Sequence, residues 1–283
     1  MKYICVGDNV IDYYVNNKRM YPGGNALNVA VHLKKLGAES AYFGNFGTDG
    51  MAGVIKRALD KFEVDYSNCY TIDGATTKHC VYNVVDGERS FIKVELGDNW
   101  QGPMHLNALD MEYIASFDVV ISSCNAKMEY EMLRIGALNN VFVYDFGEKE
   151  KYRTDEYLSK VCPDLDLALF SLEPCSISEI LQFAKRILSF GAKNVLVTMG
   201  KRGQYLINDD IMIFGETKLV DAVDTMGAGD SFLAAFVKCM AEAGWKKGER
   251  FTPEKTKAAL EAGANYAREN CLVEGGFGYE VLE

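Results

Sequence analysis

The feature that most constrains the fold is a repeated alternation of short apolar runs with helical patterns. A β-rich run at Tyr3–Val6 is followed by helical spacing of apolar residues over Asn25–Leu36, then by a strand pattern at Ser40–Phe46 and a second helix at Asp49–Phe62. This order predicts a parallel sheet that is covered by helices on both faces, an α/β fold. The alternation resumes later, with expected strands at Asp118–Ser122, Val141–Phe146, Asp166–Phe170 and Asn194–Thr198, and expected helices at Ser176–Phe190, Gly229–Ala243 and Pro253–Asn270.

Two stretches interrupt the alternation with hairpin patterns. Residues 81–85 and 89–94 flank Asp86–Gly87, a dipeptide that suits a tight hairpin turn. An antiparallel hairpin inside an α/β chain usually stands apart from the main sheet, so we expect a lid or an edge contact here. A second hairpin pattern covers 204–207 and 211–214. The chain has no internal repeat, low-complexity tract or linker, so we expect one domain over residues 1–283.

Charge and composition exclude several classes of function. The net charge is −10 and the hydrophobic fraction is 48%, which suits a globular protein without the basic footprint of nucleic-acid or anionic-membrane binding. No apolar run reaches the ~20 residues of a membrane span, and the N-terminus lacks a signal-peptide pattern. The eight cysteines show no Cys-x-x-Cys pair and the three histidines are far apart. We therefore expect reduced thiols, no structural zinc site and a cytoplasmic location.

The stretch Asp224–Phe232 carries the most chemistry. Gly227-Ala228-Gly229 stands directly before an apolar helical run, and the free amides of a helix N-terminus form a site for anions. An acidic protein that binds a polyphosphate needs such a local device. Asp230 in the first turn could accept a proton from a hydroxyl while the amides hold a phosphoryl group. The alternative interpretation is that Asp224 and Asp230 are only a turn acid and a favourable charge at a helix start.

This stretch resembles the signature Asp-Thr-x-Gly-Ala-Gly-Asp of the ribokinase-like (PfkB) carbohydrate kinases. The family's N-terminal signature is also matched, by Gly23-Gly24-Asn25-Ala26-Leu27-Asn28-Val29-Ala30. Two motifs near opposite ends of the chain, in the family's order, are far more specific than either motif alone. The resemblance implies a three-layer α/β/α sandwich with a small β lid over the sugar, formed by about residues 12–22 and 76–95.

The resemblance also implies roles at the reacting end. Asp230 takes the position of the base that deprotonates the acceptor hydroxyl, and the amides of Gly227, Ala228 and Gly229 form the anion hole for the transferred phosphoryl group of ATP. Asp224 matches a position that helps to hold a monovalent cation such as K⁺ in relatives, and a buried structural acid is an equal alternative.

Further positions match the nucleotide and metal sites of the family. Thr198, Gly200 and Gly203 resemble its nucleotide loop, Asn265 falls where relatives line the adenine pocket, and Gly276 resembles the closing turn beside the nucleotide. The usual Asn-x-x-Glu, which organises the water shell of Mg²⁺, is replaced by Ser171-Leu172-Glu173-Pro174. Glu173 could still act on Mg²⁺ through water.

The sugar end matches at four positions. Asp12 corresponds to the acid that grips substrate hydroxyls, while Gly23, Gly24 and Asn28 complete the floor of the sugar site. An exposed apolar face on the lid hairpin would favour a homodimer through the lid.

Within the family, the N-terminal run and the short lid look most like fructoselysine 6-kinases, which phosphorylate the 6-hydroxyl of fructoselysine. A fructokinase, a ribokinase or a 2-keto-3-deoxygluconate kinase is the alternative, and Lys18 and Arg19 keep a sugar acid open. A catalytically silent sugar or nucleotide sensor is an alternative of another class, because a fold alone does not establish activity.

Overall fold

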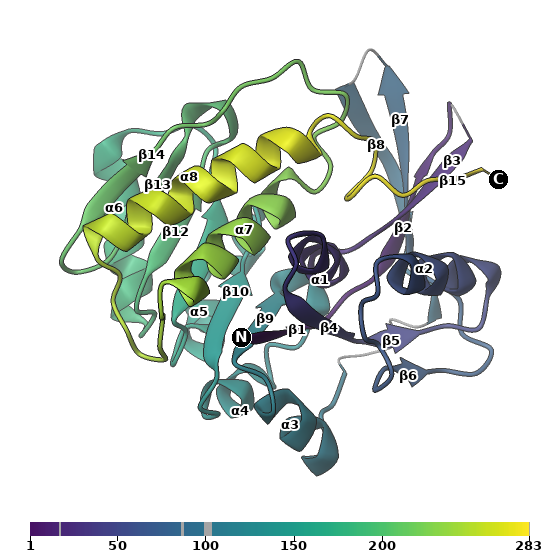
Figure 1. Ribbon diagram of the computed structural model, residues 1–283, viewed down its shortest axis with the longest axis horizontal. Helices are drawn as coiled ribbons and strands as arrows, with labels where there is room; N and C mark the ends of the chain where they lie inside the picture. The colour runs from purple at the N-terminus through teal and green to yellow at the C-terminus, as the bar shows by residue number, and fades with distance from the viewer. Residues whose placement is uncertain (17, 86–87, 99–103, 283) are drawn as a thin grey trace.

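An eight-stranded sheet forms the middle layer of the protein (Figure 1). The computed structural model describes residues 1–16, 18–85, 88–98 and 104–282. Six neighbouring strands run parallel, and the last two at one edge are antiparallel because they form the predicted second hairpin. The strand order is β14 (Met212–Gly215), β13 (Gln204–Ile207), β12 (Val195–Thr198), β11 (Leu167–Ser171), β10 (Val141–Asp145), β9 (Val119–Ser123), β1 (Lys2–Val6) and β4 (Glu39–Phe43).

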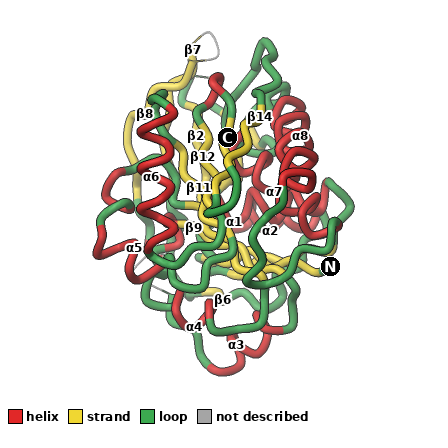
Figure 2. Tube along the Cα trace, turned by 90° about the vertical axis from the view of Figure 1, so that its left-hand side faces the viewer, coloured by secondary structure: helices red, strands yellow, loops and turns green. Residues whose placement is uncertain are grey.

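Helices cover both faces of this sheet, so the predicted α/β fold is confirmed. Figure 2 shows the strands between two helical layers. One layer holds α1 (Asn25–Lys35), α7 (Ala228–Glu242) and α8 (Pro253–Asn270), and the other holds α5 (Asp155–Val161) and α6 (Ile177–Ser189). The remaining helices are α2 (Gly50–Lys61), α3 (Ala108–Ala115) and α4 (Met132–Gly136). In the part of the chain that the structure describes, none of these helices has the length and apolarity that a membrane span needs.

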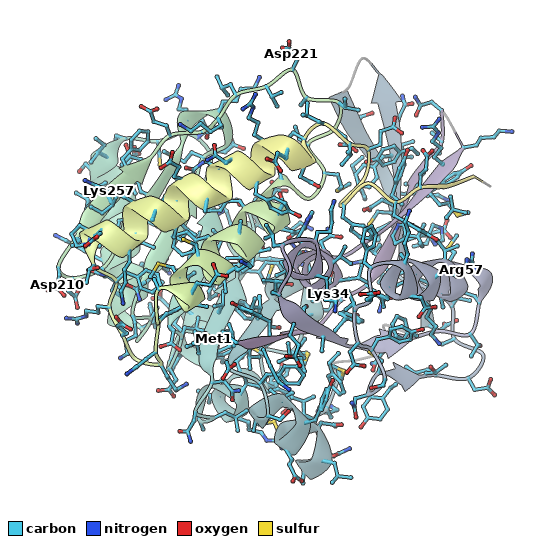
Figure 3. The ribbon with its side chains drawn as sticks, viewed as in Figure 1. Met1, Lys34, Arg57, Asp210, Asp221 and Lys257 are labelled. Carbon is cyan, nitrogen blue, oxygen red and sulfur yellow. The ribbon has the colours of Figure 1, made fainter. Side chains whose placement is uncertain are left out.

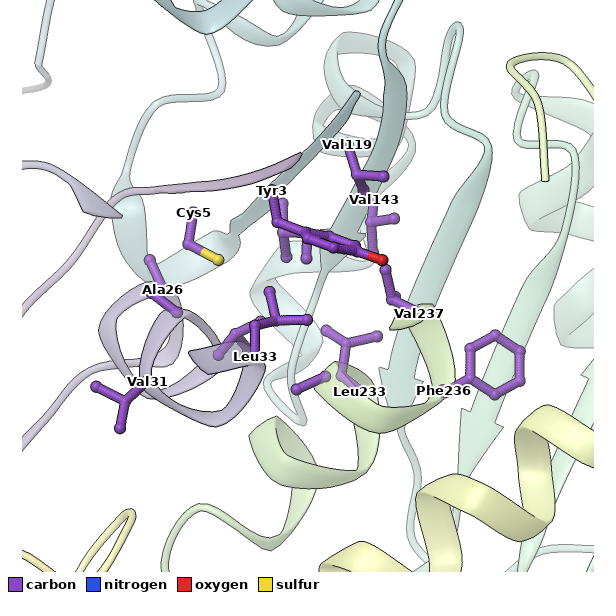
Figure 4. Close-up of a cluster of buried hydrophobic side chains, with 14 of the residues drawn as sticks. Tyr3, Cys5, Ala26, Val31, Leu33, Val119, Val143, Leu233, Phe236 and Val237 are labelled. Carbon is purple, nitrogen blue, oxygen red and sulfur yellow. The ribbon is translucent and has the colours of Figure 1, made fainter. Parts of the chain in front are cut away.

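The central strand β1 is apolar throughout because both of its faces are buried. Tyr3 and Cys5 point into the cluster shared with α1 and α7, whereas Ile4 and Val6 belong to the cluster on the opposite face. Figure 4 shows the first cluster, with Tyr3 and Cys5 facing α1 and Leu233 of α7. A parallel strand buried on both faces reads as a continuous apolar run. This packing brings α1 and α7 together above β1.

A second, five-stranded sheet stands apart from the first and contains the predicted lid hairpin (Figure 1). Residues 12–22 were predicted to belong to the lid, with no strands assigned to them, and two strands form there. The turn predicted at residues 86–87 lies outside the described residues. The order is β15 (Val281–Leu282), β3 (Arg19–Gly23), β2 (Val10–Tyr14), β7 (His79–Val85) and β8 (Glu88–Glu95), so the end of the chain also contributes.

The strand expected at Ser40–Phe46 is broken in two by Gly44. β4 ends at Phe43, and Asn45–Phe46 form β5, which pairs with β6 (Tyr70–Thr71) in a two-stranded sheet. A Cβ atom at Gly44 would collide with the Tyr42 hydroxyl and the Gly7 carbonyl. The chain therefore leaves the main sheet at Gly44, where only a residue without a side chain fits.

Candidate active site

The N-terminus of α7 is shaped by glycine. Gly227 precedes the helix with φ 70°, and a Cβ atom there would collide with the Gly276 carbonyl, so a glycine is required. Gly229 is exposed, and a Cβ atom at this position would meet no atom within 4 Å. The Ala228 amide donates to the Thr225 carbonyl at 3.3 Å, so the open position at this helix start is Gly229, where the helix dipole favours an anion.

The Asp230 carboxylate is held by two amide side chains of α1. Asp230 is only 6% exposed. Its Oδ1 accepts a hydrogen bond from Asn25 Nδ2 at 2.8 Å, and its Oδ2 accepts one from Asn28 Nδ2 at 2.7 Å. Because α1 and α7 pack against each other over β1, the carboxylate is oriented before any ligand arrives. Asn28, predicted to lie in the floor of the sugar site, is thus in direct contact with the predicted base.

Three buried carboxyl groups influence one another around Asn25. Burial raises the pKa of Asp230 to about 6, against the two amide hydrogen bonds and with a contribution from the charge of Asp8. Burial, followed by the charges of Asp230 and Asp8, raises the pKa of Asp145 to about 7, although the Gly147 amide opposes this shift. Asn25 links the group, since its Nδ2 also lies 3.5 Å from Asp145 Oδ2. Raised pKa values of two neighbouring buried carboxyl groups, Asp145 and Asp230, are typical of sites that exchange protons.

Asp8 anchors the start of α1 beneath this group. Its carboxylate accepts hydrogen bonds from the backbone amides of Asn25 at 3.3 Å and Ala26 at 3.4 Å. Gly24, the residue before the helix, has φ 108°, and a Cβ atom there would lie 2.8 Å from the Asp8 carbonyl. The predicted floor residue Gly24 therefore fixes the angle at which α1 leaves the lid sheet.

The predicted sugar residue Asp12 lies on the lid sheet. It is 4% exposed, and its backbone pairs with Tyr21 on one side and Cys80 on the other. A Cβ atom at Gly23 would lie 2.7 Å from Asp12 Oδ2, so Gly23 leaves room for the carboxylate. Gly23 and Gly24 join β3 directly to α1, which links the Asp12 region to Asn25 and Asn28.

A cavity of about 470 Å³ lies between the carboxyl ends of β11 and β12 and the N-terminus of α7. Such an edge is where open α/β sheets usually bind ligands. Among the predicted residues it is lined by Thr198, Gly200, Glu173, Ala228 and Gly229, so the structure brings the nucleotide loop, the anion loop and the metal candidate together.

Three predicted nucleotide residues do not line this cavity. Asn265 is exposed on α8, because the helix presents Ala264, Ala267 and Arg268 to the cavity at a spacing that excludes Asn265. Gly203 closes the turn into β13. The carbonyl of Gly276 accepts from the Asn270 side chain at 3.2 Å and lies 3.0 Å from His32 Nε2, so this residue supports the anion loop from behind.

Asp224 connects three segments of the chain. Its Oδ2 accepts hydrogen bonds from the Tyr14 hydroxyl at 2.6 Å and the Gly275 amide at 2.9 Å, and its Oδ1 accepts from the Met226 amide at 2.9 Å. These contacts fit the structural-acid alternative, since they tie the lid to the anion loop. The predicted role in holding a monovalent cation stays a prediction.

The cavity has two carboxylates that suit a magnesium ion held through water. Glu173 and Glu148 both line it. Mg²⁺ in phosphate sites keeps several waters and needs only one or two carboxylates. Over the described residues, His, Cys, Asp and Glu form no group of three that could hold a metal directly. Glu148 and Glu173 therefore suit a Mg²⁺ ion that is bound mainly by the nucleotide phosphates and water.

Three residues of the site have no counterpart among the residues predicted from the sequence. Asn25 lies inside the N-terminal signature but received no role, and Asp8, two residues after the β-rich run Tyr3–Val6, was not singled out. Asp145 ends the apolar strand β10. An acid at the carboxyl end of a buried parallel strand is a usable signal, because ligands bind at that edge of the sheet.

The whole chain resembles solved sugar kinases in fold. A ribokinase from Giardia lamblia has a TM-score of 0.79 at 18% identity and covers 97% of this chain and 94% of its own. The Arabidopsis thaliana ribokinase complexed with ribose and ATP has a TM-score of 0.77 at 20% identity, covering 98% and 94%. The fold is therefore ribokinase-like, as the sequence predicted.

The family follows from the sequence comparisons. The model of the pfkB family carbohydrate kinases matches residues 2–277, and the chain belongs to this family. It is 34% identical to the fructosamine kinase FrlD of Bacillus subtilis (strain 168), over 99% of this chain and 94% of that protein. It is 30% identical to the fructoselysine 6-kinase of Escherichia coli (strain K12), over 86% and 88%. The chain is thus a carbohydrate kinase.

Replacing the candidate base tests its role. In Asp230→Asn the side chain can no longer accept a proton, so we expect kcat to fall by at least ~10³-fold while nucleotide binding is retained. Steady-state kinetics and calorimetric ATP titration measure the two effects. Glu242→Gln, at the exposed end of the same helix, is the matched control and should keep full activity. Undiminished turnover in Asp230→Asn would remove this residue from the mechanism.

The raised pKa of Asp230 predicts the acidic limit of activity. A base with a pKa of about 6 becomes protonated as the pH falls through 6, so kcat/KM should drop about tenfold per pH unit below that value. A profile from pH 5 to 8, with circular dichroism at each pH as a check on folding, measures this. A flat profile down to pH 5 would contradict the assignment.

Proposed function

We propose that this carbohydrate kinase transfers the γ-phosphoryl group of ATP to the 6-hydroxyl of a fructosamine, with fructoselysine as the substrate to test first. The observation that carries the mechanism is the buried Asp230 carboxylate, held by Asn25 and Asn28 at the N-terminus of α7. Relatives at 30% identity or more, a fructosamine kinase and two fructoselysine 6-kinases, support this substrate class.

The geometry gives each group one task. Asp230 accepts the proton of the sugar hydroxyl while the hydroxyl oxygen bonds to the γ-phosphorus, and the bond from that phosphorus to the bridging oxygen of ADP breaks. The N-terminus of α7, with the exposed Gly229, stabilises the charge on the phosphoryl oxygens. Because the transition state is largely dissociative, positioning and charge stabilisation supply most of the rate enhancement.

The proposal also covers the metal ion and the cellular location of the enzyme. Glu173 and Glu148 would hold Mg²⁺ through water, and the ion would neutralise charge on the β- and γ-phosphates. K⁺ near Asp224 stays a prediction. A cytoplasmic location is supported by the eight cysteines, which are all free thiols in the structure.

The substrate is tested by measuring ADP release with MgATP against fructoselysine, fructose, ribose and 2-keto-3-deoxygluconate in parallel. We expect kcat/KM to be highest for fructoselysine, by at least tenfold over each of the others. A preference for one of the simple sugars would keep the Asp230 mechanism and discard the fructosamine. Fructokinases at 25% identity are also among the relatives, so fructose is the most informative competitor.

A catalytically silent sensor is the second candidate that the panel addresses. ATP binding without turnover on any of the four sugars would favour it. The oriented Asp230 carboxylate beside an open anion site argues against a pure binder, because a binder gains nothing from a base at the phosphoryl position.

We further propose that the enzyme is a homodimer through the lid. The edge strand β8 exposes Phe91 (58%), Ile92 (52%) and Val94 (42%), and Leu96 just beyond it is 52% exposed. Exposed apolar side chains on a strand at the open edge of a sheet mark an association surface.

Sedimentation velocity measures the association directly. The wild-type protein should sediment as a dimer, and Phe91→Glu should shift it toward the monomer because a charge would be buried in the interface. Ile177→Glu, at a position that is 55% exposed at the start of α6, on the opposite side of Figure 1 from the lid sheet, should leave the dimer intact. A monomeric wild type at micromolar concentration would contradict the proposal.

A further inference from the structure

A second cavity, of about 690 Å³, lies between α2 and the lid sheet. One wall is a single face of α2, because Met51, Val54 and Arg57 follow one another at a spacing of three residues. The opposite wall belongs to the lid sheet, where Met20 of β3 pairs with Val281 of β15. This cavity shares no lining residue with the nucleotide cavity, so it is a separate space.

The cavity lies on the face of the lid sheet that is turned away from the predicted sugar residue Asp12. Asp12 pairs with Cys80 of β7, whereas the cavity is lined by His79, the preceding residue of the same strand. Successive side chains of a strand point to opposite faces of a sheet. A molecule in this cavity would therefore contact the back of the sheet that carries Asp12 on its front.

The proposed dimer surface leaves this cavity accessible. Val94 pairs with Cys80 and Phe91 pairs with Tyr82, so these two apolar side chains lie on the same face of the sheet as Asp12. An association through them would not cover the opposite face, where the cavity opens.

One part of the cavity is acidic. Asp49, the residue before α2, accepts hydrogen bonds from the Thr77 amide at 2.8 Å and the Thr77 hydroxyl at 2.6 Å, which places it beside the start of β7. In β7, His79 Nε2 lies 3.1 Å from Glu95 Oε2, and Asp49, His79 and Glu95 all line the cavity. Lys93 also pairs with Glu95 but is absent from the lining. Two carboxylates against one ammonium group leave a net negative charge here.

The same part of the cavity has an unmet hydrogen-bonding atom. The Nδ1 atom of His79 is buried and has no partner in the described structure. When the ring is neutral and Nε2–H donates to Glu95, Nδ1 is an acceptor. Both the histidine and the carboxylates therefore favour a ligand that donates hydrogen bonds.

The cation of the cavity is Arg57, which is exposed on α2 (Figure 3). In the part of the chain that the structure describes, Arg57 forms no ion pair. A Cβ atom at Gly53 would lie 3.4 Å from Arg57 Nη1, so the guanidinium lies back along the helix, level with Gly53. The four residues from Asp49 to that level span about 6 Å of the helix axis.

These features together define the chemistry of a ligand. A single unpaired guanidinium suits a carboxylate, while the two acids of the same cavity disfavour the dianion of a phosphate and suit an ammonium group. Apolar side chains complete the lining, from Met20, Met51, Val54 and Val281. A molecule with one carboxylate, one ammonium group and an aliphatic chain matches all three features.

We propose that this cavity is an effector site for an aliphatic amino acid, whose carboxylate binds Arg57 and whose ammonium group binds Glu95 and Asp49. The inference goes beyond the proposed function, because this binding requires neither ATP nor a sugar. The ligand would contact α2 and the lid sheet at once and would hold the lid against the core.

The bound amino acid should favour the lid position seen in this structure. In that position the hydroxyl of Tyr14, a lid residue, donates to Asp224 beside the anion loop at 2.6 Å. A ligand shifts an equilibrium toward the form that it binds more tightly, and such coupling is reciprocal. We therefore expect the amino acid to lower the KM for the sugar and to leave the KM for ATP unchanged.

Calorimetric titration of the full chain, without ATP or sugar, tests the site. The probes are leucine and 6-aminohexanoate, which carry the ammonium group next to the carboxylate or at the far end of the chain. Hexanoate and hexylamine are the matched analogues that lack one of the two charges. We expect at least one of the amino acids to bind once per chain, at least ~10-fold more tightly than both analogues.

Charge variants locate the binding. In Arg57→Gln and in Glu95→Gln the affinity for the amino acid should fall at least ~fivefold. Lys257→Gln removes a charge at the other end of the molecule from Arg57 (Figure 3) and should bind as the wild type does. Asp12→Asn should also bind normally, because Asp12 lies on the other face of the lid sheet. Thermal unfolding of each variant verifies the fold.

Four outcomes decide between the alternatives. Absence of binding by both amino acids, or binding that survives Arg57→Gln and Glu95→Gln, would overturn the inference and leave the proposed function standing. Binding that is lost only in Asp12→Asn would assign the amino acid to the sugar site and overturn it as well. An unchanged KM for the phosphorylated sugar at saturating amino acid would overturn the effector role. Normal amino-acid binding without phosphorylation of any sugar would instead reject the proposed function.

Discussion

The packing of α1 against α7 across the buried strand β1 is the contact on which the site depends. It places Asn25 and Asn28 of one helix at hydrogen-bond distance from Asp230 of the other, although more than two hundred residues separate them in the chain. The helices can approach because their facing surfaces are made of small and branched apolar residues such as Ala26 and Leu233. The carboxylate is thus oriented by the core of the protein, and substrate binding need not supply that order.

The second constraint is the cost of burying acids together. Asp8, Asp145 and Asp230 lie within mutual electrostatic reach, and their partners are amides and backbone N–H groups. Hydrogen bonds reduce the free-energy cost of burying these carboxylates, but they do not cancel the desolvation that raises the pKa of Asp145 and Asp230. A strong cation beside Asp230 would lower its pKa and weaken it as a base.

The parts of the fold that could be predicted from the sequence are those that depend on short stretches of residues. The alternation of strands and helices, the second hairpin and the two signature motifs are all local, and the structure confirms the fold that they indicated. The partners of Asp230 could not be derived in the same way. Helix packing brings Asn25 into hydrogen-bond contact with Asp230, and the strand order brings Asp145 within electrostatic reach of it. Asn265 shows that position along the chain is not enough to assign a residue to a site. The family resemblance placed it at the nucleotide site, but successive residues of an α-helix are rotated by about 100°. Asn265 therefore points away from the helix face on which Ala264 and Ala267 line the cavity.

The lid strands β2 and β3 were hidden from pattern reading for a physical reason. Asp12 and Tyr21 are buried in them, so polar side chains break the apolar alternation that identifies a strand. Of these two residues, Asp12 was assigned to the sugar site by the family resemblance. Residues kept for ligand binding can thus interrupt the apolar alternation by which a strand is predicted from the sequence.

The most direct test of the central claim is a crystal structure of the enzyme with fructoselysine and a non-hydrolysable MgATP analogue. The account predicts that the 6-hydroxyl oxygen lies within about 3 Å of an Asp230 carboxylate oxygen, in line with a γ-phosphate at the N-terminus of α7. A 6-hydroxyl bonded to another side chain, with Asp230 still closed onto Asn25 and Asn28, would contradict it.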